Sequence, residues 1–191
     1  MEALNELFIL FISYLLGCIN GAYYLGKVVK KQDIRALGSH NAGARNAGRI
    51  FGRSAFIVTV IIDASKTIIP LLLGIYFLHT SVLFSGCIAI SILLGHIWPF
   101  QLKFRGGKGV VVYLAAALAL APLTLIAVGL TVLVGLKIKN NFTIVGLIGL
   151  STIPLTLIIL MKYILTLVFL TLLLIVIIAH RKVYKYDDDH I

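Results

Sequence analysis

The sequence predicts an all-α integral membrane protein with seven transmembrane helices, its N-terminus outside the cell and its C-terminus in the cytoplasm. Of its 191 residues, 60% are hydrophobic and 13% are charged, whereas about 25% of the residues of a soluble domain are charged. A globule of this size would therefore lack the polar residues to cover its surface. The long apolar runs show no polar alternation, so helices rather than a β-barrel are expected to satisfy the backbone in lipid.

The distribution of basic residues predicts which loops face the cytoplasm. Apart from Lys66 and Lys162, all of the 17 Lys and Arg residues fall in four windows, 27–53, 103–108, 137–139 and 181–185. Clusters of cations between apolar runs are typical of cytoplasmic loops. The net charge of +10 is therefore expected to face membrane lipids and anionic substrates rather than nucleic acid.

Five apolar runs are long enough to cross about 30 Å of hydrocarbon as single helices. They cover roughly residues 4–29, 55–78, 81–100, 142–160 and 163–179. The turns near His79 and Lys162 are expected outside the cell. Residues 1–191 are predicted to form a single membrane domain with a short cytoplasmic tail, 180–191.

The segment 110–136 allows two interpretations. As one span, it would place Lys137 and the basic tail on the side opposite the other cations. As two short helices that break near Pro122, it returns both to the cytoplasm, which the charge rule favours. Each half would have only about 12 to 13 residues, or about 20 Å of helix. We therefore expect a tight helical hairpin shielded by neighbouring helices, and whether both halves cross completely stays open.

No metal or cofactor is expected. The five histidines are scattered along the chain without a cluster of acidic residues beside them, unlike the closely spaced ligands of a metal site. Cys18 and Cys87 each lie within an apolar run and are interpreted as small buried hydrophobic residues. The sequence also has no Ser-His-Asp pattern and no nucleophile elbow.

A polar stretch from Gly38 to Arg49, GSHNAGARNAGR, stands between the first two apolar runs. Glycine allows the backbone to turn sharply and to approach a ligand closely. Arginine offers a planar set of donors that suits phosphate or carboxylate. This pattern favours an anion-binding loop, and the alternative is a basic loop that only sets the orientation of the protein.

A second glycine-rich stretch, GGKG at 106–109, leads directly into the apolar segment that starts at Val110. A glycine turn before a helix presents free backbone N–H groups and the positive end of the helix dipole, which together bind anions. The stretch is not a Walker A loop, because that motif requires glycine at the position of Leu102 and Ser or Thr at that of Gly109.

Three ionisable residues lie within or at the end of apolar runs. Asp63 and Lys66 are three residues apart and so share a helical face. They form either a neutralising salt bridge or part of a polar site inside the bundle. His96, in Gly95-His-Ile-Trp-Pro99, is either a structural hydrogen-bonding residue or a member of the same site.

Several motifs in order resemble one family. Asp33-Ile-Arg35 followed by GSHNAGARN at 38–46 is similar to DIR…GSGNxGATN, and GHIWP at 95–99 with GGKGV at 106–110 is similar to GHxxP…GGKGVAT. Asp63 and Lys66 resemble its DxxKG pattern, and His180 the histidine of its third motif. Over essentially its whole length, the chain resembles the bacterial acyl-phosphate-dependent glycerol-3-phosphate acyltransferases, the PlsY family.

The resemblance implies a seven-helix protein of the bacterial cell membrane with its active site facing the cytoplasm. It implies transfer of an acyl chain from acyl phosphate to the sn-1 hydroxyl of glycerol 3-phosphate, which gives lysophosphatidic acid and phosphate. No cofactor is implied, and a monomer is expected. The residues assigned to catalysis are His180, Ser39 and Lys108, and those assigned to binding phosphate or glycerol are Gly38, Asn41, Arg45, Asn46, Arg49, Gly106, Gly107, Gly109, Lys66, His96 and Thr143.

The chain departs from the family pattern at several polar positions. His40 stands where the family has Gly, Arg45 where it has Thr, and Val183 where it has Asn. Cys18 and Asn20 replace Ser and Pro, and Thr143 is the only hydroxyl in a turn that usually carries serine. These changes leave two alternatives open: a paralogue that acylates another acceptor, or a non-enzymatic protein of the same fold that binds or transports lipid.

Overall fold

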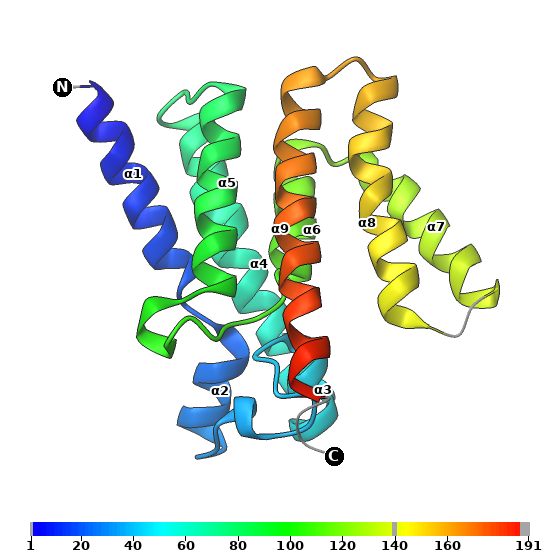
Figure 1. Ribbon diagram of the computed structural model, residues 1–191. Coiled ribbons are helices and arrows are strands. Elements are labelled where there is room, and N and C mark those ends of the chain that lie inside the picture. Colours follow the sequence, from blue (N-terminus) through cyan, green and yellow to red (C-terminus); the bar gives the residue numbers. More distant parts are fainter. Residues whose placement is uncertain (1, 139–140, 188–191) are drawn as a thin grey trace.

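The computed structural model describes residues 2–138 and 141–187, and the regular secondary structure in that part is all helical (Figure 1). Its elements are α1 (Glu2–Gly17), α2 (Gly21–Val29), η1 (Ile34–Ala36), α3 (Ala44–Phe51), α4 (Arg53–Tyr76), α5 (Val82–Ile97), η2 (Phe100–Leu102), α6 (Val110–Leu120), α7 (Thr124–Ile138), α8 (Phe142–Ile159) and α9 (Tyr163–Asp187). The all-α prediction is confirmed. Lys139 and residues 188–191, which the sequence analysis assigns to basic loops and to the tail, lie outside the described residues.

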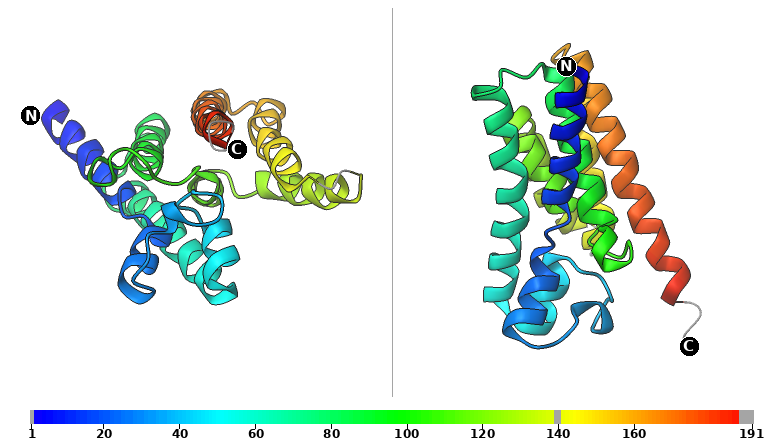
Figure 2. Two further views of the ribbon diagram at one scale, coloured as in Figure 1. Left: turned by 60° about the horizontal axis from the view of Figure 1, so that its bottom comes forward. Right: turned by 90° about the vertical axis from the view of Figure 1, so that its left-hand side faces the viewer.

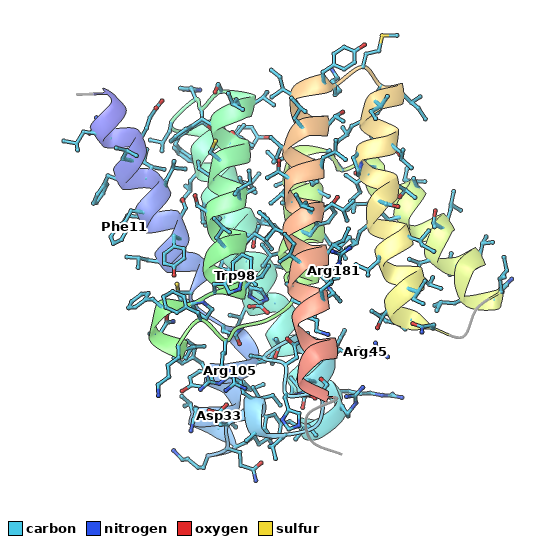
Figure 3. The ribbon with its side chains drawn as sticks, viewed as in Figure 1. Phe11, Asp33, Arg45, Trp98, Arg105 and Arg181 are labelled. Carbon is cyan, nitrogen blue, oxygen red and sulfur yellow. The ribbon has the colours of Figure 1, made fainter. Side chains whose placement is uncertain are left out.

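Among the described residues, four helical segments are long and apolar enough to cross a membrane alone: Arg53–Tyr76, Val82–Leu102, Phe142–Ile159 and Tyr163–Arg181. The pair α1 and α2 passes the same test together, and α6 and α7 are shorter apolar helices. Large apolar side chains on the outside of α1, α4, α7 and α8 are exposed; Phe11 of α1, for example, points away from the bundle in Figure 3. Such a surface requires lipid around it.

The apolar run 4–29 is not one straight helix. It breaks after Gly17 into α1 and α2, which meet at 47°. Asn20 caps the second helix, since its side-chain oxygen accepts from the N–H of Tyr23 at 2.9 Å. Its amide nitrogen donates to the carbonyl of Ala42 at 3.0 Å, so the break is bound to the polar stretch 38–49.

The core lies where α5, α6 and α9 meet, with α1, α4 and α8 around them (Figures 1 and 2). The largest fully buried side chains there are Tyr113 of α6 and Phe169 of α9, whose rings pack edge to face with centroids 5.5 Å apart. The hydroxyl of Tyr113 donates to the carbonyl of Leu150 at 3.2 Å, which joins α6 to α8. The helix that carries the GGKG turn is therefore held at the centre of the bundle.

The segment 110–136 does form two helices that break near Pro122, as predicted. The expected tight hairpin is wrong, because α7 leaves α6 and packs along α8 at the edge of the molecule (Figure 2). Helix α6 packs mainly against α4, with further contacts to α5 and α9, whereas α7 packs mainly against α8. Glycines bring α7 and α8 together instead: a side chain at Gly149 would meet Val132, and one at Gly135 would meet Val145.

All the described basic segments lie at the same end of the bundle (Figure 1). The chain runs down through α1, up α4, down α5, up α6, down α7, up α8 and down α9. Helices α2 and α3 with η1 form a cap at that lower end, around a small cluster of buried residues: Ala22, Ile34, Ala42, Ala47 and Ala55. The cap faces the GGKG turn and the last turns of α9, so the motifs of the sequence analysis are brought to one place.

Candidate active site

A cavity of about 810 Å³ opens at the capped end and continues into the bundle. Its polar end is lined by Ser39, Asn41, Arg45, Asn46, Arg49, Asp63, His96, Lys108, Thr143 and His180. Its deeper part is apolar and runs between α4, α6 and α8, lined by Phe56, Val60, Ala64, Ile68, Val111, Leu114, Leu118, Leu125, Leu147 and Leu150. Ten of the predicted residues line it, counting Gly109; Gly38, Gly106, Gly107 and Lys66 lie behind that lining.

Asn46 holds the polar stretch 38–49 in shape. Its side-chain oxygen accepts from the N–H of Ser39 at 3.0 Å, and its amide nitrogen donates to the carbonyls of Leu37 at 2.8 Å and Asn41 at 3.1 Å. Gly38 packs against the same amide with φ of 60°, a conformation that favours glycine. With its amide groups engaged in this way, Asn46 positions Ser39 and Asn41 at the cavity.

The GGKG turn is fixed by the end of α5. The N–H of Gly106 donates to the carbonyl of Ile97, and that of Gly107 to the carbonyl of His96, both at 3.0 Å. These two N–H groups are thus not free for an anion, contrary to the sequence-based expectation for the whole turn. Lys108 and Gly109 line the cavity instead, and the first turn of α6 follows with its unpaired N–H groups, a favourable place for negative charge.

His180 of α9 faces this turn across the cavity. Its Nδ1 lies 2.8 Å from the carbonyl oxygen of Val176. A carbonyl can only accept, so Nδ1 carries the proton, and Nε2 of the neutral ring keeps a lone pair. His180 also interacts electrostatically with the ammonium of Lys108. The arrangement places a proton acceptor beside a fixed cation.

Arg45 extends from α3 toward the start of α8 (Figure 3). One of its terminal nitrogens donates to the hydroxyl of Thr143 at 3.3 Å, and its guanidinium lies over the ring of Phe142. Arg49, one turn later on α3, lines the same cavity. Together with Lys108, these arginines make the polar end cationic.

Asp63, Lys66 and His96 form a buried polar cluster behind that end. The Nζ of Lys66 lies 2.9 Å from Oδ1 of Asp63 and 2.9 Å from Nδ1 of His96. It also donates to the carbonyls of Gly17 and Ile19, at the break between α1 and α2. The salt bridge that the sequence suggested is present, and it reaches the cavity through Asp63 and His96.

The DIR segment secures the cap from outside. The guanidinium of Arg35 holds both carboxylate oxygens of Asp33, at 3.1 Å and 2.9 Å, and donates to the carbonyl of Leu102 at 2.8 Å. The hydrogen bond from Arg35 is the main reason that the pKa of Asp33 lies below its usual range. The hydrogen bond from Arg35 to Leu102 thus ties η1 to η2, which precedes the GGKG turn, while the ion pair holds the guanidinium in place.

The unusual residues differ in their distance from the cavity. Arg45 and Thr143 line it, whereas Cys18 is buried elsewhere and His40 is exposed, with its ring nitrogen at 3.2 Å from the carbonyl of Arg35. The side chain of Val183 lies outside the described residues. Of these four departures from the family pattern, Arg45 and Thr143 lie in the cavity lining, and His40 and Cys18 do not.

The apolar lining of the cavity and the role of Gln101 could not be predicted from the sequence. Nothing in the sequence separates Val60 or Leu114, which line the groove, from other apolar residues of the same helices. Gln101 donates to the carbonyl of Cys18 at 2.7 Å and so supports the break between α1 and α2. Its position directly after Pro99-Phe100, as a polar residue at the end of an apolar run, is the only signal that the sequence offers.

Known proteins are similar to this chain in sequence and in fold. The profile of the family described as "Glycerol-3-phosphate acyltransferase" matches residues 7–186. The chain belongs to this family. It is 40% identical over 139 residues to the glycerol-3-phosphate acyltransferase of Thermoanaerobacter pseudethanolicus (71% of this chain, 69% of the relative). It is 35% identical over 178 residues to glycerol-3-phosphate acyltransferase 1 of Desulfitobacterium hafniense (93% of this chain, 88% of the relative).

The fold matches a solved structure of the same family. The crystal structure of PlsY (YgiH), an integral membrane glycerol 3-phosphate acyltransferase in its glycerol 3-phosphate form, superposes with a TM-score of 0.85 and 25% identity. The match covers 93% of this chain and 89% of that one. This acyltransferase is thus a multi-pass integral membrane protein, as its apolar surface requires.

Proposed function

We propose that this protein transfers an acyl chain from acyl phosphate to the sn-1 hydroxyl of glycerol 3-phosphate, giving lysophosphatidic acid and phosphate. The observation that carries the proposal is the continuity of one cavity from a cationic end to an apolar groove between α4, α6 and α8. Both substrates carry a phosphate, and one of them carries a long acyl chain. The match to a family member whose structure holds glycerol 3-phosphate supports the same assignment.

The proposal places the site at the cytoplasmic face of the bacterial cell membrane. Helices α1 with α2, α4, α5, α6, α7, α8 and α9 would form seven membrane segments, with the N-terminus outside. The gathering of basic segments at the capped end supports this orientation, because cytoplasmic loops are enriched in Lys and Arg. Residues 1–191 would act as a single domain and as a monomer, with surrounding membrane lipids in contact with the apolar face.

The two phosphates would be held by different walls of the cavity. Lys108, Gly109 and the first turn of α6 offer a point charge and backbone donors to one of them. Arg45 and Arg49 offer planar donors to the other. Ser39 and Asn41 would orient the glycerol, and Thr143 would contribute a hydroxyl. Because all of these groups are held by the cap and by α6, they would act mainly by positioning the substrates.

The reaction requires no covalent enzyme intermediate. The sn-1 oxygen attacks the carbonyl carbon of acyl phosphate, and the bond from that carbon to the bridging oxygen breaks. Phosphate leaves with the electron pair, and the hydroxyl proton passes to Nε2 of His180, which keeps a lone pair. A phosphate oxygen, with a second pKa of about 6, is the alternative acceptor. Lys108 would stabilise the negative charge that develops.

Purified protein in lipid nanodiscs tests the proposal. With palmitoyl phosphate and glycerol 3-phosphate, we expect release of phosphate and formation of lysophosphatidic acid that require both substrates. Lys108→Ala should abolish most turnover, whereas Lys103→Ala, an exposed lysine outside the cavity, should not. Turnover with a different alcohol but not with glycerol 3-phosphate would overturn glycerol 3-phosphate as the proposed acceptor. Full activity of Lys108→Ala would overturn the proposed role of Lys108 in binding phosphate.

A further inference from the structure

The environment of Lys66 defines the proton positions of His96. Lys66 is 8% exposed and Asp63 1%, and the groups around Nζ are a carboxylate, two carbonyl oxygens and a ring nitrogen. The three oxygens can only accept and together take three hydrogens from Nζ, so Nζ is an ammonium group rather than a neutral amine. An ammonium has no lone pair. Nδ1 of His96, 2.9 Å away, must therefore be the unprotonated nitrogen, and the proton of the neutral ring is on Nε2.

The Nε2 side of the ring points to the GGKG turn. A side chain at Gly107 would collide with Nε2 and Cε1 of His96, so the ring occupies the space that the glycine leaves open. His96 is 2% exposed and lines the cavity. Among the described residues, the hydrogen bonds and ion pairs of this ring all involve Nδ1. Among the described residues, the fully enclosed side-chain atom that lacks a partner is Oγ1 of Thr59 and not Nε2 of His96, so the Nε2–H group is open to the cavity, where a ligand can supply its acceptor.

We propose that His96 donates a hydrogen bond through Nε2–H to a phosphate oxygen at the GGKG turn, and that Lys66 is the positioning residue that fixes this tautomer. This inference rests on the proposed function for the nature of the anion. A neutral, fixed donor suits a site that already has Lys108 as its cation. In this arrangement the Asp63–Lys66 pair orients a hydrogen-bond donor at the cavity and also holds the carbonyl groups at the break between α1 and α2.

The two histidines of the site thus have opposite tautomers. His180 has its proton on Nδ1 and a lone pair on Nε2, while His96 has its proton on Nε2 and a lone pair on Nδ1. One can accept a proton from the attacking hydroxyl, and the other can only donate to an anion. Exchange of their roles is prevented by the carbonyl of Val176 on one side and by the ammonium of Lys66 on the other.

Two substitutions at His96 distinguish donation of a hydrogen bond to phosphate from a purely structural role of this side chain. His96→Gln places an amide N–H near the position of Nε2, whereas His96→Asn reaches only the position of Nδ1. We expect the KM for acyl phosphate or for glycerol 3-phosphate to rise about tenfold or more in His96→Asn and to stay within about threefold in His96→Gln, since a hydrogen bond to a charged group is lost only in the first. His79→Asn, in the turn at the opposite end, is the matched control. Equal effects of Asn and Gln, with lower thermal stability in both, would show a purely structural role and overturn the proposal.

A binding measurement tests the inference without turnover. In wild-type protein with ¹⁵N-labelled histidine, NMR should show the His96 proton on Nε2, and its resonance should shift on titration with inorganic phosphate. In Lys66→Met, folded as judged by its thermal transition, the preference for this tautomer should be lost. A proton on Nδ1 in the wild type, or no response to phosphate, would contradict the inference. Failure of acyl transfer with a normal phosphate response would instead contradict only the proposed function.

Discussion

The guanidinium carbon of Arg45 lies 4.7 Å from the centroid of the Phe142 ring. Arg45 belongs to α3 and Phe142 to the first turn of α8, so the contact spans the polar opening of the cavity between two helices. Cation–π contacts at exposed sites contribute only about 0.5–1 kcal/mol, and the accompanying hydrogen bond to Thr143 is long, at 3.3 Å. The side chain can therefore leave this position for a phosphate at little cost.

Replacement of Arg45 should weaken binding of a phosphate substrate. A hydrogen bond to a charged group contributes about 1.5–3 kcal/mol, so Arg45→Ala should raise the KM for glycerol 3-phosphate by about tenfold or more. Phe142→Ala, which removes the resting contact but leaves the charge of Arg45 at the cavity, should change this KM by less than about threefold. The control is Arg53→Ala, an exposed arginine outside the cavity. Steady-state kinetics with equal KM values for Arg45→Ala and Arg53→Ala would refute the assignment.

Gly146 is expected to set the space available to the acyl chain. It lies on α8 in the lining of the groove, and a side chain there would meet no atom within 4 Å. Gly146→Leu should therefore fold and fill part of the groove. Each methylene that loses its place costs about 0.8 kcal/mol, or about a fourfold loss in kcat/KM, so the preference should shift to shorter acyl phosphates.

The control for this variant is Gly129→Leu on α7. A side chain at Gly129 also meets no atom within 4 Å, but the residue does not line the cavity. Competition between lauroyl and palmitoyl phosphate, read by mass spectrometry of the products, gives the selectivity directly. An unchanged product ratio in Gly146→Leu would show that the acyl chain does not occupy this groove.

The features of the fold that depend on apolar runs and on the distribution of charge could be predicted from the sequence. The break near Pro122 and the gathering of basic segments at one end follow from hydropathy and charge alone. The break after Gly17 does not, because it depends on Lys66 and Gln101, which are distant in sequence and satisfy the carbonyls of Gly17, Cys18 and Ile19. The place of α7 also depends on packing, since Gly135 and Gly149 let α7 and α8 approach each other closely.

The motifs that form the candidate site could be predicted from the sequence, but the role of each residue within them could not. Asn46 and Arg45 are neighbours in one polar stretch and both line the cavity, yet the amide of Asn46 is used by hydrogen bonds within the stretch while the guanidinium of Arg45 reaches across to α8. The sequence predicted that the backbone N–H groups of Gly106 and Gly107 would be free to bind an anion. In the structure they donate hydrogen bonds to carbonyl groups at the end of α5. These differences depend on which groups meet across the fold, and residue type alone does not contain that information.

The Asp33–Arg35 pair should make the stability of the cap depend on pH. The hydrogen bond from Arg35 keeps the pKa of Asp33 below its usual value. A carboxyl group with a lower pKa in the folded state stabilises the fold above its unfolded pKa, about 3.9, and this contribution is lost as the pH falls through the folded value. Both groups are partly exposed to solvent, so the contribution should be below about 1 kcal/mol.

Asp33→Asn is the corresponding variant. At neutral pH it should lower the unfolding temperature by no more than about 2–4 °C, and the difference from wild type should shrink as the pH is lowered below about 3.9. Glu6→Gln, in the N-terminal half of α1, is the control, since the N-terminal end of that helix lies opposite the cap (Figure 1). Differential scanning fluorimetry across this pH range measures both, and a difference that grows on acidification would contradict the ion-pair argument.

Gly95 should be intolerant of even a methyl group. A Cβ at this position would collide with the carbonyl oxygen of Tyr14, and one at Gly17 with the backbone of Ile92, so α1 and α5 touch through their glycines. Gly95→Ala must push α1 outward, and such overpacking costs about 1–3 kcal/mol. The displacement would also draw the carbonyl of Gly17 away from Lys66, so activity should fall together with stability.

Gly129→Ala gives the opposite expectation in a helix with open space. Alanine is favoured over glycine inside a helix by about 1 kcal/mol, and the new methyl group at Gly129 meets no neighbour within 4 Å. Thermal unfolding in detergent should therefore show a lower transition temperature for Gly95→Ala and an equal or higher one for Gly129→Ala. If both substitutions raised the transition temperature, α1 and α5 would not be in backbone contact, and the support that α1 gives to Lys66 would have to come from elsewhere.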